Sequence, residues 1–310
     1  MRRIFAADGH LVHDPAAGLT FYAPRPHPPG RVQLDAADVA TWPVVSPSDV
    51  ERTMPVSLCW SPIVRCNLHC PQCLDDTSVP EQGAADRRRI AALLATSGVL
   101  GVDISGGEPL LLRDLPALAR QLTDAGRVAV SVTTNGWHLQ HRIGYLAATV
   151  DAIRVSLDGP DAPRHDRIRG TGSFARAVDG IRAGIAATVP MQIQTVLMAS
   201  NRDTAQDMVD LAASLGVGGV TFLQMLPIGA GAHLRAEMLA DADATAVLGT
   251  LRVPASVRVR LRTRDAAGGF TVIRADGRIW RNDVAALHIG GLRPLVAVAD
   301  LAVTCRDGSA

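Results

Sequence analysis

Short apolar runs alternate with longer amphipathic segments along the middle of the chain. The runs are rich in β-branched residues, which favours strands, whereas the segments between them have the length and spacing of helices. Strands are predicted at residues 56–64, 101–105, 128–133, 152–157, 191–198 and 218–225, and helices at residues 84–96, 112–125, 139–148, 174–188 and 204–215. Such alternation predicts parallel strands covered by helices. We therefore expect an α/β fold, a partial (βα)6 TIM-like barrel whose site lies at the C-terminal ends of the strands.

The pattern changes on both sides of this region. Three domains are expected: an N-terminal extension at residues 1–55, the partial barrel at residues 56–226 and a small α+β C-terminal appendage at residues 227–310. The expected elements outside the barrel are a hairpin at residues 5–22, a stiff proline connector at residues 24–29, a helix at residues 236–251 and β-runs at residues 257–262 and 270–273.

Composition excludes several classes of protein. The formal net charge is +1, aromatic residues make up 4% of the chain, and no basic block stands out, so nucleic acid is not an expected partner. The longest uncharged stretch is too short to span a bilayer, and Asp8-Gly9-His10 interrupts the apolar N-terminus too early for a secretory signal. We expect a cytoplasmic protein without a membrane partner.

Three of the five cysteines are crowded into one loop after the first predicted strand. Cys66, Cys70 and Cys73 have the spacing C-x3-C-x2-C. Three thiolates can bind three irons of a [4Fe–4S] cube and leave the fourth iron open to a small chelating molecule. A zinc site is the alternative, with His69 as fourth ligand, but His69 lies inside the motif and cannot easily converge with three sulfurs. Three unligated core cysteines are not expected in a polar, proline-containing loop.

Further polar motifs follow the next predicted strands. Ser105-Gly106-Gly107-Glu108-Pro109 follows the second strand, Thr134-Asn135-Gly136 the third, and Ser156 and Asp158 lie at the end of the fourth. Glycines let a backbone approach a ligand closely, and Glu108 offers an acceptor. Ordinary turns are the alternative for the glycines and for Asp158-Gly159. Because parallel strands end at one edge, these motifs are expected to meet there.

Together these motifs resemble the radical S-adenosylmethionine (radical SAM) superfamily. The resemblance implies one [4Fe–4S] cluster on the three cysteines and SAM bound through its amino and carboxylate groups to the open iron. The residues that it assigns to SAM are Gly106, Gly107, Glu108, Pro109, Thr134, Asn135, Ser156, Asp158 and Arg169. Arginine suits a carboxylate because its planar fork binds both oxygens. One position departs from the family: Gln72 stands where an aromatic residue commonly packs near adenine. The expected adenine contact is therefore a polar one at Gln72, or one that moves to Leu74.

The appendage resembles the start of the auxiliary-cluster domain of peptide-modifying relatives, without its cysteines. Arg281 and Asn282 stand where a cluster ligand is expected, so we predict one cluster only. Cys305 is a candidate hydrogen-atom donor to a substrate radical, and a free thiol near the terminus is the alternative. Cys59, inside the first predicted strand, is expected to be a small core residue.

The resemblance implies reductive cleavage of SAM to a 5′-deoxyadenosyl radical that abstracts a hydrogen atom, with flavodoxin or ferredoxin as electron donor. The expected substrate is a ribosomal peptide or another natural-product intermediate, with epimerisation or rearrangement as the outcome. A sugar or nucleoside small molecule is the alternative substrate, and a non-catalytic iron–sulfur protein is the alternative class. A molybdenum-cofactor cyclase is disfavoured, because such relatives use a second cluster. Candidate substrate-facing residues are Asp75, Asp76, Trp137, His138, Gln192, Gln194, Gln224 and His233.

Overall fold

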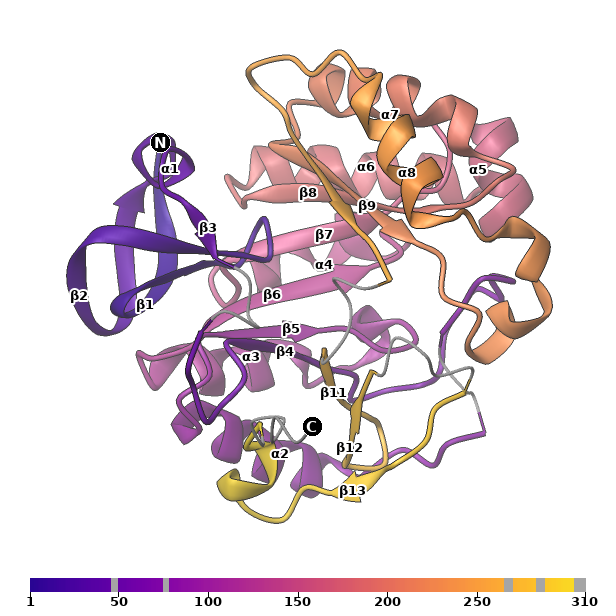
Figure 1. The fold of residues 1–310 in the computed structure, drawn as a ribbon. Coiled ribbons are helices and arrows are strands. Elements are labelled where there is room, and N and C mark those ends of the chain that lie inside the picture. The colour runs from indigo at the N-terminus through magenta and orange to yellow at the C-terminus, as the bar shows by residue number, and fades with distance from the viewer. Residues whose placement is uncertain (46–49, 75–77, 265–269, 283–287, 304–310) are drawn as a thin grey trace, which may run out of the picture.

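A computed structural model describes residues 1–45, 50–74, 78–264, 270–282 and 288–303 of the chain. These residues form two sheets, a small antiparallel one at the N-terminus and a large, mostly parallel one that carries the rest of the fold (Figure 1). No helix in the described ranges is long and apolar enough to cross a membrane. The predicted site residues Asp75, Asp76 and Cys305 lie outside the described residues.

The small sheet is built from a long hairpin and a short third strand. Its strands are β1 (Arg2–Asp14), β2 (Leu19–Asp35) and β3 (Val44–Val45), and the short helix α1 (Ala36–Ala40) connects β2 to β3. The expected hairpin is therefore present but longer, and the proline-rich segment is part of β2 rather than a connector. The register explains how β2 tolerates its prolines: the ladder passes from Leu11↔Tyr22 to Gly9↔His27, so Pro24 and Pro26 fall in an irregularity where no ladder hydrogen bond is needed.

The large sheet contains the six predicted barrel strands in sequence order. Its strands are β4 (Ser57–Trp60), β5 (Gly101–Ile104), β6 (Ala129–Thr134), β7 (Ala152–Ser156), β8 (Met191–Leu197), β9 (Gly219–Gln224), β10 (Arg258–Arg262), β11 (Thr271–Ile273), β12 (Arg278–Arg281) and β13 (Arg293–Pro294). The spatial order runs β10-β9-β8-β7-β6-β5-β4-β11-β12-β13. In this order, all strands from β10 at one edge to β11 are parallel to their neighbours. Within the described residues the sheet does not close into a barrel.

The tail contributes more to this sheet than its pattern predicted. β10 extends the parallel sheet beside β9, after α8 (Asp241–Gly249), and β11 extends the opposite edge beside β4. The tail is therefore not only the small appendage that we expected, because β10 adds a parallel strand to the sheet of the barrel region. The yellow hairpin of β11 and β12 lies beside β4 in Figure 1.

Helices cover the outer face of the parallel strands. They are α2 (Ala84–Thr96), α3 (Leu115–Asp124), α4 (Leu139–Leu146), α5 (Ala162–Arg169), α6 (Ser173–Ala186) and α7 (Ala205–Leu215), with 3-10 turns at Pro109–Leu111, Arg202–Thr204, Gly229–His233, Arg235–Glu237 and Val298–Leu301. Alternate strand residues such as Val102, Val132 and Val155 are buried in the core under these helices. The residues between them face the opposite side, which we call the inner face.

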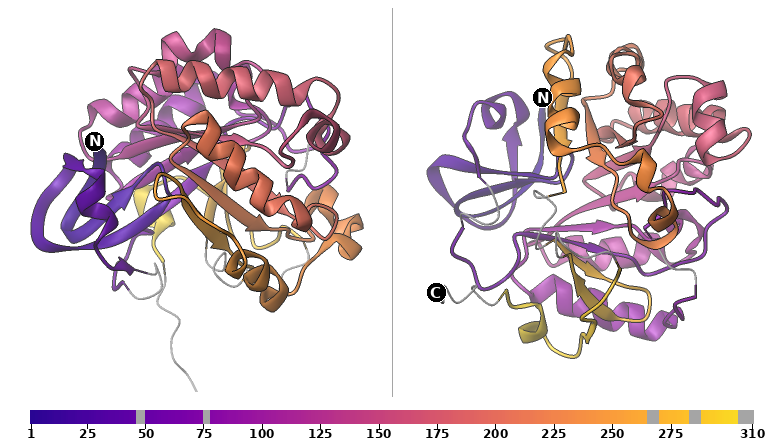
Figure 2. Two further views of the ribbon diagram at one scale, coloured as in Figure 1. Left: turned by 90° about the horizontal axis from the view of Figure 1, so that it is seen from above. Right: turned by 45° about the vertical axis from the view of Figure 1, so that its right-hand side comes forward.

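The hairpin of β1 and β2 covers the N-terminal ends of the central strands. Leu11 packs on Leu100 and Ala129, which lie at the starts of β5 and β6. In Figure 1 and in both views of Figure 2 the indigo hairpin stands at one end of the large sheet. The C-terminal ends of the strands, where the predicted motifs follow, therefore lie away from this hairpin.

Candidate functional site

The three cysteines lie on one loop directly after β4. Each thiol is partly exposed, and the loop closes on itself where the Cys73 amide donates to the Cys70 carbonyl at 3.2 Å. His69 is exposed, and within the described ranges no three His, Cys, Asp or Glu side chains converge to hold one metal ion. In a cubane cluster each thiolate binds a different iron, whereas a zinc site needs its ligands on one ion.

Burial makes two of these thiols less acidic. It raises the pKa of Cys70 to about 11 and raises the pKa of Cys66, and the nearby thiols and Asp158 add to the effect on Cys70. Arg169 opposes this shift, since its Nη1 lies 3.9 Å from the Cys70 sulfur. A guanidinium beside the loop thus favours the thiolate form that iron ligation requires.

Gly106 and Gly107 lie against the cysteine loop. The Gly107 amide donates to the Ile63 carbonyl at 2.8 Å, and a Cβ on Gly107 would overlap the carbonyl oxygens of Val64 and Arg65. Gly106 has φ +120°, which side chains rarely adopt. The close approach that these glycines permit is therefore to the cysteine loop, rather than the approach to a ligand that we expected.

Glu108 is completely buried behind this loop and accepts three hydrogen bonds. Its Oε1 accepts from the Leu110 amide at 2.9 Å and from Thr134 Oγ1 at 2.7 Å, and its Oε2 accepts from the Asn135 amide at 2.8 Å. Burial raises the pKa of Glu108 to about 6, although these three donors lower it. A carboxylate offers about four acceptor positions, so one remains on Oε2. Thr134 serves to hold Glu108, and Pro109 begins the buried turn that follows it.

Asn135 connects the end of β6 to the cysteine loop. Its Nδ2 donates to Asn67 Oδ1 at 3.0 Å and lies 3.7 Å from the Cys66 sulfur. Its Oδ1 accepts from the Trp137 amide at 2.9 Å, which fixes the orientation of the side-chain amide. Glu108, Asn135 and Cys66 therefore form one connected group.

A second group centres on Asp158, whose side chain is completely buried. Its Oδ2 accepts from Gln72 Nε2 and from Arg169 Nε, each at 2.6 Å, and its Oδ1 accepts from the Val196 amide at 2.8 Å. Burial alone would lower the pKa of Arg169, but Asp158 and the thiol of Cys70 hold it above its ordinary value. Gln72, Arg169 and Cys70 therefore meet around one carboxylate that does not itself reach the surface.

The other predicted residues are placed less centrally. Ser156 is the last residue of β7 and is partly exposed on the inner face opposite Gln194, whereas Asp158 lies beyond the strand end. Gln224 is buried, and its side-chain amide makes two hydrogen bonds to the backbone. It donates to the Leu239 carbonyl and accepts from the Arg264 amide, each at 2.6 Å. Gln192 is also buried, Trp137 and His138 are partly exposed, and His233 is exposed.

Sequence reasoning missed the polar inner face of the sheet. Asp103 on β5 accepts from Arg154 on β7 at 2.6 Å, and Arg262 lies on β10 with the same orientation. The signal was present as an alternation of polar and apolar residues, which is clearest along β10. Cys59 also lies on this face and is partly exposed beside a small apolar cluster, so it is not the core residue that we expected.

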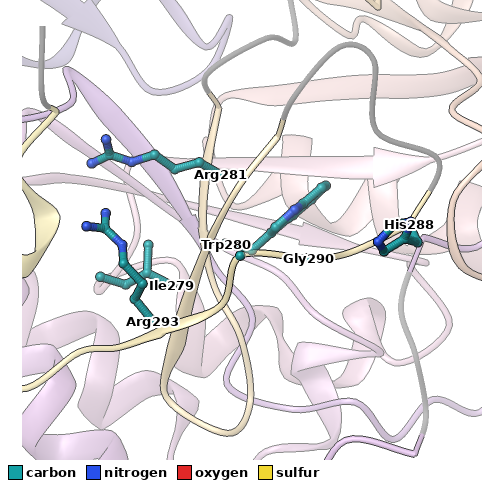
Figure 3. Close-up of a pocket in the computed structure, with 7 residues that line it drawn as sticks. Ile279, Trp280, Arg281, His288, Gly290 and Arg293 are labelled. Atoms are coloured by element: carbon teal, nitrogen blue, oxygen red, sulfur yellow. The ribbon is translucent and has the colours of Figure 1, made fainter. Parts of the chain in front are cut away.

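One described cavity lies elsewhere, in the C-terminal appendage. It has a volume of about 340 Å³ and is lined by Ile279, Trp280, Arg281, His288, Gly290, Gly291 and Arg293. Figure 3 shows the arginines on one side and Trp280 and His288 on the other. None of these residues is a cysteine, so this cavity is not a cluster site.

The residues present fit a [4Fe–4S] cluster and SAM. The donor set is three thiols on one loop, and the fourth iron would face ligands other than this chain's thiols. Gln72 Oε1 is buried and has no hydrogen-bond partner among the described residues, which leaves an acceptor for a bound molecule. Glu108 offers a second acceptor and Arg169 a cation, which match the ammonium and carboxylate of an amino acid.

Comparisons with known proteins agree with this geometry. A model of the radical SAM superfamily matches residues 60–212. GTP 3',8-cyclase 1 of Mycobacterium tuberculosis is 33% identical over 209 residues, which are 63% of this chain and 58% of that protein. AdoMet-dependent heme synthase of Methanosarcina barkeri is 34% identical over 184 residues, 57% of this chain and 52% of that protein. The chain thus aligns with little more than half the length of these curated relatives.

Two solved structures share the fold. Streptococcus suis SuiB bound to precursor peptide SuiA has a TM-score of 0.61 at 16% identity and covers 73% of this chain and 59% of its own. Native anSMEcpe with bound AdoMet has a TM-score of 0.58 at 18% identity, covering 75% of this chain and 76% of its own. Enzymes of this family use a [4Fe–4S] cluster and SAM. Residues 60–212 therefore form a radical SAM domain.

Proposed function

We propose that this chain holds one [4Fe–4S] cluster on Cys66, Cys70 and Cys73 and uses SAM to abstract a hydrogen atom from a substrate on the inner face of the sheet. When bound, the reduced cluster supplies the electron that cleaves SAM to methionine and a 5′-deoxyadenosyl radical. The observation that carries the proposal is that two separate hydrogen-bonded groups, around Glu108 and around Asp158, both reach the cysteine loop.

Each group has a distinct task at the amino-acid end of SAM. Glu108 accepts from the ammonium with the remaining acceptor position of Oε2, while Thr134 and the Asn135 amide fix the carboxylate. Arg169 pairs with the SAM carboxylate through Nη2, which makes no hydrogen bond within the described chain, while Asp158 orients the guanidinium through Nε. Asp158 thus supports the site rather than touching SAM.

Gln72 is proposed to bind the adenine. Its Nε2 is committed to Asp158 Oδ2, so its amide orientation is fixed and the buried Oε1 is an acceptor without a partner among the described residues. An exocyclic amine would satisfy that acceptor. This polar contact replaces the aromatic packing that the family commonly has at this position.

The substrate proposal has two forms. A ribosomal peptide or other natural-product intermediate has support from the likeness to SuiB, whose structure was solved with a precursor peptide and which shares only the fold with this chain. A nucleoside or sugar small molecule has support from the sequence similarity to GTP 3',8-cyclase 1. The same similarity favours a cyclase, whereas Arg281 and Asn282, which stand where a cluster cysteine is expected, disfavour one. Epimerisation or rearrangement, with flavodoxin or ferredoxin as electron donor in the cytoplasm, remains our proposal for the outcome.

Anaerobic reconstitution tests the enzyme proposal. The protein is loaded with iron and sulfide, then given SAM and dithionite, and 5′-deoxyadenosine is measured. We expect 5′-deoxyadenosine from the wild type and strongly reduced formation from Glu108→Gln, with Glu51→Gln as a control because Glu51 is exposed and makes no contact with the described site. A protein with a full cluster that never cleaves SAM would instead support the non-catalytic alternative.

A further inference from the structure

The inner face of the large sheet carries more arginine than carboxylate. Arg154 on β7 and Arg258, Arg260 and Arg262 on β10 share this face, because Val259 and Leu261 between them pack into the core on the other side. The carboxylate among them is that of Asp103. Its Oδ1 accepts from Arg154 Nη1 at 2.6 Å and from Ser131 Oγ at 2.7 Å, and its Oδ2 accepts from Thr133 Oγ1 at 2.8 Å.

Two of these arginines donate hydrogen bonds to the N-terminal hairpin. Arg154 donates to the carbonyls of Pro15 and Ala16, and Arg260 donates to the carbonyls of Ala17 at 3.1 Å and Gly18 at 2.7 Å. The turn between β1 and β2 thus supplies carbonyl acceptors to both guanidiniums. It does so at the N-terminal side of the sheet, where the hairpin lies.

Arg258 and Arg262 lie at opposite ends of β10, each over an aromatic ring. The Arg258 guanidinium carbon lies 5.5 Å from the centroid of Phe21 on the hairpin, and that of Arg262 lies 4.3 Å from the centroid of Phe270. Arg262 is at the C-terminal end of its strand. Because the strands are parallel, this is the edge at which the cysteine loop and Glu108 follow β4 and β5.

Arg262 makes no hydrogen bond and no ion pair with any described residue, in contrast to Arg154 and Arg260. Burial lowers its pKa, and Arg154 lowers it further, although Cys59 and Asp103 facing it oppose the shift. A guanidinium withdrawn from water without an anion is costly. Its stacking on Phe270 offsets only part of that cost. The side chain is still partly exposed, so a molecule on the inner face can reach it.

We propose that Arg262 binds an anionic group of the substrate, a carboxylate or a phosphate, on the inner face beside the SAM site. The proposal rests on the proposed function for the identity of that molecule as substrate. It assigns a chemical class to the substrate: a compound with an oxyanion at one end, held by a bidentate guanidinium on β10, and a hydrogen atom presented toward the ends of β4 to β7.

Anion binding to the cluster-loaded protein tests this directly. Inorganic phosphate and acetate are titrated separately by calorimetry into the wild type, Arg262→Gln and Arg258→Gln. We expect Arg262→Gln to weaken binding of the preferred anion about tenfold or more, which equals about 1.4 kcal/mol, and Arg258→Gln to change it less than about twofold. A preference for phosphate indicates a phosphorylated substrate, and a preference for acetate a carboxylic acid.

The control variant is matched to its partner, since both residues are arginines on one face of one strand and both lie over a phenyl ring. Absence of binding of either anion to the wild type, or equal weakening in both variants, would overturn the proposal. If Arg262→Gln does not fold, Arg262→Lys keeps the charge but loses the planar fork, and unchanged phosphate and acetate affinity in that variant would also overturn it.

Formation of 5′-deoxyadenosine without substrate separates this inference from the proposed function. We expect Arg262→Gln to retain wild-type iron content and wild-type uncoupled SAM cleavage, because Arg262 makes no contact with the groups around Glu108 and Asp158. If anion binding depends on Arg262 but no protein cleaves SAM, the proposed function fails and the anion site remains. If SAM is cleaved and neither anion binds, the anion site fails alone.

Discussion

Arg169 donates from Nε to Oδ2 of Asp158 at 2.6 Å, and the two residues are eleven positions apart on either side of the start of α5. Asp158 is completely buried, so its charge depends on Arg169 and on the donors of Gln72 and Val196. The same helix carries an exposed pair of equal length, Arg164 Nη1 to Asp161 Oδ2 at 2.6 Å. One helix therefore offers a buried and an exposed ion pair for comparison.

Arg169→Gln is expected to destabilise the fold by about 3 kcal/mol, because it leaves a buried carboxylate without its cation. Arg164→Gln is expected to cost less than about 1 kcal/mol, since its pair is solvated and its backbone cap remains. Urea unfolding monitored by circular dichroism measures both values in protein of equal cluster content. Equal losses in the two variants would show that Asp158 does not depend on Arg169.

Local motifs predicted the chemistry better than they predicted the contacts. The cysteine spacing and the run from Ser105 to Pro109 are continuous in sequence, so they were visible without the fold. The bond between Gln72 and Asp158 joins residues 86 positions apart and depends on how the loop after β4 lies against the loop after β7. Spacing carries no information about such a contact.

The fold shows the same division. Barrel strands such as β6 were predicted because their apolar outer positions recur with helices between them. β10 was assigned to a separate appendage because the strand–helix pattern changes after residue 226, and only the packing of its apolar positions under α8 places it beside β9. The prolines of β2 were assigned to a connector because the irregular register that accommodates them is a property of the pair of strands.

SAM binding is expected to depend on pH through Glu108, whose pKa burial raises to about 6. Only the carboxylate form attracts an ammonium group, so SAM affinity should fall as the pH decreases below about 6, by up to about tenfold per pH unit. Equilibrium dialysis with labelled SAM, with iron content measured at each pH, gives the curve. Glu108→Gln should bind weakly without this dependence and Glu51→Gln should keep it; a flat wild-type curve would contradict the assignment.

The same pKa has the opposite consequence for the fold. The unfolded carboxyl ionises near 4.5 and the folded one near 6, so Glu108 favours folding most at pH values below 4.5. This contribution decreases as the pH rises from 4.5 through about 6 and is constant above that range. Its sign is that of a buried carboxyl for which desolvation outweighs three hydrogen bonds.

Cluster content should distinguish the three loop cysteines from Cys59. Cys66→Ala, Cys70→Ala and Cys73→Ala should each lose most of the about four irons that a cubane cluster contributes. Cys59→Ser should retain them, because Cys59 lies on β4 beside Val272 and Trp280 and is 3.8 Å from the Ser61 hydroxyl, outside the loop. Iron analysis and the visible absorption of reconstituted protein check this. Loss of iron in Cys59→Ser would reassign the ligand set.

Gly107→Ala should damage the cluster loop without touching a cysteine. A methyl group there overlaps the carbonyl oxygens of Val64 and Arg65, which are backbone atoms and cannot rotate away. Overpacking of this kind typically costs about 1–3 kcal/mol, and here it pushes the loop away from Glu108, so iron content and SAM affinity should fall together. The matched control is Gly144→Ala in α4, where a Cβ meets nothing within 4 Å and helix propensity predicts a gain of about 0.5–1 kcal/mol. Thermal unfolding and iron analysis of both variants measure the contrast, and a Gly107→Ala protein with full iron content would show that the cysteine loop does not need this close approach.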